Sequence, residues 1–67
     1  MKPIEFGTRL AKRRAKLGES QEALARRAGV VANTWSRWER GDVKPTLDNL
    51  PGIAKALGIT VSELMED

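Results

Sequence analysis

The sequence predicts an all-α protein that folds as one domain of five short helices. Glycines and prolines divide the chain into short segments, and within most segments the apolar residues recur at spacings of three and four, the period of a helix. A chain of 67 residues buries only about 60% of the surface that its unfolded form exposes. We therefore expect residues 1–67 to share one small core.

The first two helices are expected over residues 4–17 and 21–28. Gly18 ends the first helix. Ser20 is a favourable N-cap for the second, because its hydroxyl can accept a hydrogen bond from a free backbone N–H of the first turn. The spacing predicts these inward residues: Phe6, Leu10, Leu17, Leu24 and Ala28.

A tight turn at Gly29 separates the second helix from a third, expected over residues 32–40. Glycine adopts a positive φ without strain, and Gly41 is placed to end the third helix in that conformation. Two short helices joined by a glycine-containing turn form the layout of a helix-turn-helix, here over residues 20–40.

A fourth helix can be capped by Thr46 and run to Leu57, but Pro51 interrupts it. Proline lacks an N–H and its ring crowds the carbonyl of Leu47, so we expect either a kink or a start delayed to about Pro51. A capping box over residues 60–63 opens a last short helix. The fourth helix is expected to bury Leu47, Leu50, Ile53, Ala54 and Leu57, and the last carries Val61, Leu64 and Met65.

Charge is unevenly distributed along the chain. Residues 1–44 hold 11 Lys and Arg against 5 Asp and Glu, whereas residues 45–67 hold 1 against 4. A basic half suits a polyanion such as nucleic acid, although many small proteins without such a partner are also basic.

The third helix has one polar face and one apolar face. Its polar face holds Asn33, Ser36, Arg37 and Arg40, whose side chains can hydrogen-bond base edges, although an ordinary solvated helix can present a similar face. Trp35 and Trp38 share the opposite stripe. We therefore assign both tryptophans to the core instead of to base stacking, because so small a protein needs large apolar side chains inside.

Two opposite charges occupy inward positions. Glu39 lies beside the tryptophans, and Arg14 follows Leu10 by four and precedes Leu17 by three. Because an unpaired buried charge is costly, we expect an Arg14–Glu39 ion pair between the first and third helices; separate side chains that reach solvent are the alternative.

Several classes of function are disfavoured by composition. The chain has no cysteine and no histidine, so disulfides, the commonest metal ligands and the usual catalytic base are missing. No apolar run has the length of a membrane span. We expect a cytoplasmic, nucleoid-associated protein that is not an enzyme, with no metal, no cofactor, no small-molecule substrate and no membrane partner.

Three sequence motifs resemble those of one known family. They are SQEALA at residues 20–25, SRWERG at 36–41 and KALG at 55–58. At these mutual spacings they resemble the Cro and phage-repressor helix-turn-helix family, also called the XRE family, over residues 4–66. The resemblance implies a five-helix, lambda-repressor-like domain whose third helix enters the major groove of duplex DNA. It also implies that the protein regulates transcription, most simply as a repressor.

The resemblance also implies roles for individual residues. The positions that most often reach base edges in the family are Ala32, Asn33 and Arg37, and those near phosphates are Gln21, Thr34, Arg40 and Lys44. The Arg14–Glu39 pair coincides with a salt bridge common in the family. The chain departs from the family pattern at several positions. Val31 stands where the family has a hydroxyl cap for the third helix, so that cap is either lost or supplied by another residue. Ala32 cannot hydrogen-bond a base but can touch a thymine methyl. Arg13 and Glu19 stand where the family often has apolar residues, and the Pro51-Gly52 pair interrupts the usual fourth helix.

The partners implied are double-stranded DNA and a second copy of the chain. A homodimer would place two recognition helices about 34 Å apart on an inverted repeat. Its contact surface is expected in the acidic C-terminal region, at Ile59, Val61, Leu64 and Met65, unless these residues complete the monomer core instead. Two other functions stay open: an antitoxin or restriction-modification controller of the same fold with a second protein partner, and a protein-only adaptor or engineered variant with weakened DNA binding.

Overall fold

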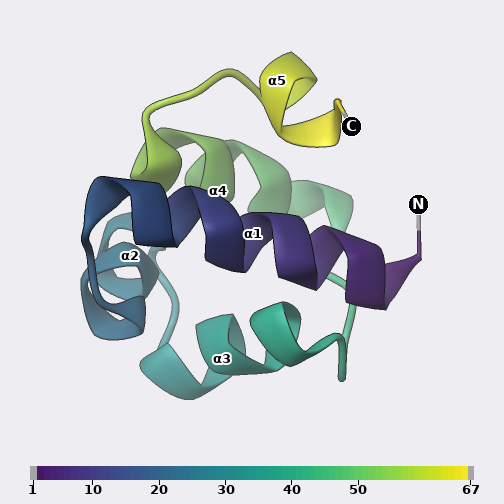
Figure 1. The fold of residues 1–67 in the computed structure, drawn as a ribbon, viewed down its shortest axis with the longest axis horizontal. Coiled ribbons are helices and arrows are strands. Elements are labelled where there is room, and N and C mark those ends of the chain that lie inside the picture. The colour runs from purple at the N-terminus through teal and green to yellow at the C-terminus, as the bar shows by residue number, and fades with distance from the viewer. Residues whose placement is uncertain (1, 67) are drawn as a thin grey trace.

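The protein is all-helical over the residues that the structure, a computed structural model, describes, which are residues 2–66. The helices are α1 Pro3–Leu17, α2 Gln21–Ala28, α3 Ala32–Arg40, the 3₁₀ turn η1 Leu47–Asn49, α4 Leu50–Leu57 and α5 Val61–Met65. In Figure 1, α1 crosses the middle of the molecule, with α3 on one side of it and α4 and α5 on the other. The predicted fold class is confirmed.

The turn between α2 and α3 forms as the sequence predicts. Ser20 caps α2, with its hydroxyl oxygen accepting a hydrogen bond from the Ala23 N–H at 3.0 Å. Gly29 ends α2 with a φ of 77°, a conformation that a residue with a Cβ adopts only with strain. At the start of α3, Val31 makes no side-chain cap hydrogen bond. The usual hydroxyl cap of this helix is therefore lost.

Pro51 delays the start of the fourth helix and does not kink it. α4 begins at Leu50, so Pro51 lies in its first turn, where a missing N–H costs no helical hydrogen bond. The preceding residues form η1, and the Thr46 N–H and hydroxyl both donate to Oδ1 of Asn49, at 3.2 and 2.9 Å. The predicted burial of Leu47 is wrong: its side chain is 83% exposed, because it precedes α4 instead of belonging to the inward face of that helix.

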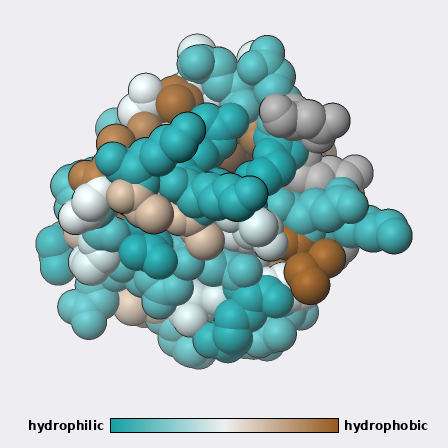
Figure 2. All heavy atoms as spheres, in the orientation of Figure 1, coloured by the Kyte–Doolittle hydropathy of each residue, from teal (hydrophilic) through white to brown (hydrophobic). Residues whose placement is uncertain are grey.

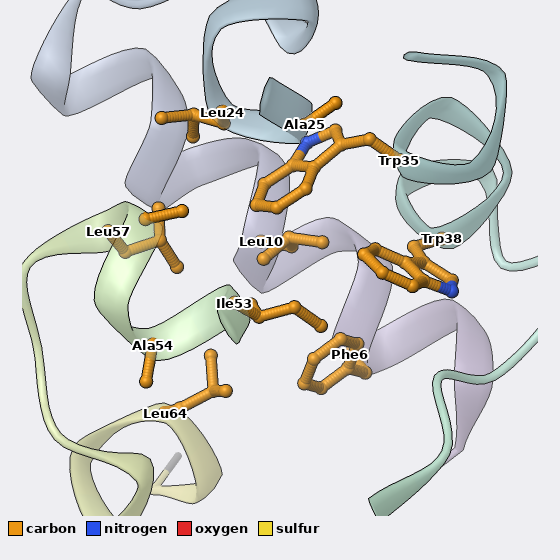
Figure 3. Close-up of a cluster of buried hydrophobic side chains, with 11 residues drawn as sticks. Phe6, Leu10, Leu24, Ala25, Trp35, Trp38, Ile53, Ala54, Leu57 and Leu64 are labelled. Carbon is orange, nitrogen blue, oxygen red and sulfur yellow. The ribbon is translucent and has the colours of Figure 1, made fainter. Parts of the chain in front are cut away.

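One core joins the helices. Its buried members are Phe6, Leu10, Leu24, Ala25, Trp35, Trp38, Ile53, Ala54, Ala56, Leu57 and Leu64. Figure 3 shows Trp35 and Trp38 reaching from α3 toward the side chains of α1 and α4, which confirms their assignment to the core. Their rings meet edge to face, with centroids 5.7 Å apart. Leu17 is a second wrong expectation, because it lies at the end of α1, outside the core cluster, and is 48% exposed.

Two arginines of α1 attach α5 to the rest of the domain. Arg9 donates to the carbonyl of Leu64 and Arg13 to that of Glu63, each at 3.0 Å. Arg13, which stands where the resemblance implies an apolar residue, thus binds one carbonyl near the end of this short helix, and Arg9 binds another. Leu64 itself is only 2% exposed. It completes the monomer core, so the expectation that it supplies an intermolecular contact is wrong.

α1 and α3 approach each other closely at Gly7. A Cβ at this position would overlap the backbone carbonyl oxygens of Trp38 and Glu39. A glycine inside a helix ordinarily costs roughly 0.5–1 kcal/mol relative to alanine. Its presence here lets the last turn of α3 lie directly on α1.

We predict that Gly7→Ala destabilises the protein, although alanine is the better helix former. The added methyl would meet backbone atoms that cannot rotate away, so the free energy of unfolding should fall by about 2 kcal/mol or more. Thr8→Ala is the control: Thr8 is exposed on the same helix, and its loss should cost less than about 0.5 kcal/mol. Urea denaturation measures both, and a Gly7→Ala variant at least as stable as the parent would contradict the packing described.

Candidate nucleic-acid interface

The polar face of α3 is turned away from the domain. Asn33 and Arg37 are exposed, whereas Ala32 and Thr34 are half-buried. In Figure 1, α3 lies on the opposite side of α1 from α4 and α5. The face of the molecule in Figure 2 is largely hydrophilic, with separate hydrophobic patches. α3 can therefore contact a large partner without displacing any other helix.

Near the end of the inward face of α3, the Glu39 carboxylate accepts hydrogen bonds from side chains of three helices. Arg14 of α1 donates to Glu39 from Nε at 2.7 Å and from Nη2 at 3.1 Å. Trp35 of α3 donates from its indole N–H at 2.6 Å. Gln21 of α2 donates from Nε2 at 2.9 Å. The predicted Arg14–Glu39 pair is present, and the two other donors were not foreseen.

This ion pair is mostly shielded from water. The Glu39 side chain is 7% exposed and the Arg14 side chain 24%. Burial disfavours the ionised carboxylate, yet the hydrogen bonds from Arg14, Gln21 and Trp35 and the positive charge of Arg14 outweigh it, so the pKa of Glu39 is lowered. The hydrogen bond to Glu39 raises the pKa of Arg14. Both groups are therefore charged at neutral pH.

Gln21 is held at the start of α2 by its bond to Glu39. The side chain is half-buried, and Nε2 is the atom that Glu39 engages. The carbonyl oxygen of the amide is thereby fixed in orientation, while the backbone N–H groups of the first turn of α2 lie at the positive end of the helix dipole. The first residue of α3 is Ala32, whose methyl side chain offers Gln21 no polar group to hydrogen-bond.

The remaining cations predicted near phosphates differ in their surroundings. Lys44 is exposed beyond the end of α3. Arg40 donates from Nε to Oδ2 of Asp42 at 2.9 Å and from Nη1 to Oγ of Ser36 at 2.7 Å. Asp42 was missed by the sequence analysis, although an acidic residue two positions after Arg40 could have indicated the pair. A guanidinium has five N–H donors, so the two bonds made by Arg40 leave other N–H groups available for a further acceptor.

Among residues 2–66, no group of three or more acidic, cysteine or histidine side chains is arranged to hold a metal ion. The described helices include none that is long and apolar enough to span a membrane.

These features define a class of protein. α2 and α3 are joined by a tight turn at Gly29, the inward face of α3 completes the core, and its outward face is polar and exposed. This is a helix-turn-helix domain. A family model described as "Helix-turn-helix domain" matches residues 5–66, and the chain belongs to that family.

Named relatives agree with this assignment. The "Cryptic phage CTXphi transcriptional repressor RstR" of Vibrio cholerae is 36% identical over 61 residues, which cover 91% of this chain and 54% of that protein. The chain thus spans about half the length of this relative. The restriction-modification controller protein C.AhdI from Aeromonas hydrophila superposes with a TM-score of 0.88 at 36% identity, covering 94% of this chain and 91% of that one.

A second solved structure contains DNA. The P22 c2 repressor protein in complex with the synthetic operator 9T superposes with a TM-score of 0.81 at 36% identity. The match covers 91% of this chain and 92% of that one. The five-helix repressor fold expected from the resemblance is therefore confirmed.

We predict that Glu39→Ala destabilises the protein by roughly 3–5 kcal/mol, because Arg14 would keep a shielded charge without its partner. Glu19→Ala is the matched control, since Glu19 also pairs with an arginine, Arg27, at 2.8 Å, but with side chains 34% and 47% exposed. An exposed pair contributes less than about 1 kcal/mol. Urea denaturation of the two variants should separate them clearly, and equal losses would contradict the role given to Glu39.

We also predict how this contribution depends on pH. Because the pKa of Glu39 is lowered in the folded protein, the unfolded chain takes up the proton first as pH falls. The stabilisation is then fully present above the ordinary value of 4.5 and is lost as pH falls through the lower folded pKa. The difference in unfolding free energy between the parent and Glu39→Gln should be constant above that value and shrink below it. A difference independent of pH would refute this assignment.

Proposed function

We propose that the chain binds double-stranded DNA sequence-specifically through the exposed face of α3 and regulates transcription, most simply as a repressor. The observation that carries the proposal is the separation of roles on this helix. Trp35, Trp38 and Glu39 anchor it from inside, which leaves Asn33 and Arg37 free to face a groove. A helix supported in this way fits the major groove of B-form DNA.

Base contacts and phosphate contacts fall to different residues. Arg37 suits the O6 and N7 atoms of guanine, Asn33 suits the N6 and N7 atoms of adenine, and Ala32 suits a thymine methyl group. The phosphate contacts are assigned to the residues that flank α3 or lie at its edges: Gln21, Thr34, Arg40 and Lys44. Phosphate contacts position the domain, and base contacts give specificity.

The DNA-bound form is proposed to be a homodimer on an inverted repeat. One domain of this size is expected to bury only about 600–1,000 Å² on DNA, which limits its specificity. Val61 and Met65 are 37% and 42% exposed, and Ile59 is half-buried. Because α5 lies on the opposite side of α1 from α3, a contact there leaves both recognition helices accessible (Figure 1).

A restriction-modification controller is the second candidate function. The likeness to C.AhdI favours it, because that match covers nearly the whole of both chains. Both candidate functions use the same DNA-binding surface. They differ in which genes the binding site controls, so a test of DNA binding serves both.

The test is a binding selection from random duplexes at two salt concentrations. We expect an inverted repeat whose half-sites are centred about one helical turn, or 34 Å, apart. Arg37→Ala should abolish the preference at one base position per half-site. Lys44→Ala should weaken binding to all duplexes and lower the slope of log affinity against log salt by roughly 1.

Lys55→Ala is the matched control for Lys44→Ala. Lys55 is an exposed lysine of α4, which lies on the opposite side of α1 from α3 (Figure 1), so its removal should leave both affinity and salt slope close to those of the parent. If the parent protein binds no duplex more tightly than random DNA, the proposed function fails.

A further inference from the structure

A hydrogen-bonded chain of three polar side chains runs along the outer edge of α3. Arg40 lies at its centre and donates from Nη1 to Oγ of Ser36 at 2.7 Å and from Nε to Oδ2 of Asp42 at 2.9 Å. Ser36 is half-buried, one turn before Arg40 on the helix, and the side chains of Arg40 and Asp42 are 54% and 50% exposed. Ser36 also shares the outward face of Asn33, three residues earlier.

The bond from Arg40 determines what the Ser36 hydroxyl can offer to a partner. A serine hydroxyl has one donor and two acceptor sites. Here Oγ accepts from a cation, which polarises the O–H bond and makes its hydrogen a better donor. Among residues 2–66 no protein atom accepts that hydrogen, although a serine inside a helix commonly donates to the carbonyl four residues earlier. Ser36 is therefore presented outward as a donor.

Asp42 keeps Arg40 in the position that this arrangement requires. An arginine side chain has many rotamers, and an exposed one samples them unless something holds it. The bond to Asp42 fixes the Nε edge of the guanidinium, so that Nη1 stays against Ser36. The N–H groups that these two bonds leave over can still contact a phosphate.

We propose that Ser36 is a further specificity-determining residue, which donates a hydrogen bond to a base edge in the major groove, and that Asp42 acts through Arg40 as a positioning residue. The inference rests on the proposed DNA-binding function. The major-groove edges of guanine and thymine present acceptors, O6 and N7 or O4, whereas cytosine presents the N4 donor. Ser36 thus favours guanine or thymine over cytosine at one position of each half-site.

The test compares base preferences in the binding selection for the parent, Ser36→Ala and Asp42→Ala. Ser36→Ala should reduce the preference over cytosine at one position by roughly 2- to 12-fold, the effect of one hydrogen bond, and leave the other positions unchanged. Alanine is the better helix former, so this variant should fold. Thr8→Ala is the matched control, because it also removes a hydroxyl from an exposed side chain of a helix, α1, and Thr8 belongs to neither the proposed DNA surface nor the proposed dimer contact, so it should keep the parental profile.

Asp42→Ala should show a combination of effects that a loss of folding would not produce. Removal of a carboxylate beside the DNA should raise affinity for every duplex, most at low salt. The same variant should weaken the preference at the position assigned to Ser36, because Arg40 is no longer held.

The outcomes separate this inference from the function on which it rests. If the parent protein is selective and Ser36→Ala has the same base preferences, the role of Ser36 is overturned and the proposed function stays intact. If the base preferences change in Ser36→Ala but not in Asp42→Ala, the positioning role of Asp42 is overturned. A parent that shows no selectivity overturns the proposed function itself, and the role of Ser36 with it.

Discussion

The Glu39 carboxylate is the point on which the arrangement of the helices depends. It accepts hydrogen bonds from Arg14 of α1, Gln21 of α2 and Trp35 of α3, so one side chain relates three helices to one another. A shielded carboxylate is tolerated only when its oxygens are satisfied, and within the described residues no buried side-chain nitrogen or oxygen lacks a partner. The position of α3 on the domain is therefore fixed by a directional interaction as well as by apolar packing, which is less selective of orientation.

α3 combines a structural face and a recognition face in nine residues. Because the helical period separates the two faces, Asn33 and Arg37 can differ between proteins of this fold without disturbing Trp35 or Trp38. Gly7 lets this helix lie against α1, and the arginines of α1 hold the other side of the domain together by capping α5. A small core is thus supplemented by specific polar contacts at the helix ends and crossings.

The sequence predicted the features that follow from local rules. Helix periodicity placed Trp35, Trp38 and Glu39 inside, and glycine and capping residues marked most helix ends. The wrong expectations and the contacts that were not predicted have common physical causes. Leu17 and Leu47 match an apolar spacing but lie at the edges of helices, where burial depends on neighbours that a single helix pattern does not contain. The bonds of Gln21 to Glu39 and of Arg40 to Asp42 depend on side-chain rotamers, and Leu64 packs inside because the path of the chain after α4 returns α5 to α1.

The central claim is that the outward face of α3 is the surface that meets DNA, and a nuclear magnetic resonance titration of the ¹⁵N-labelled protein with its selected duplex tests it most directly. The account predicts that the largest changes in chemical shift fall on the backbone amides of residues 20–44, on the side-chain amide of Asn33 and on Nε of Arg37. Smaller changes at Val61 and Met65 would accompany formation of the dimer. Changes that are confined to α4 and α5, or spread evenly over the domain, would contradict it.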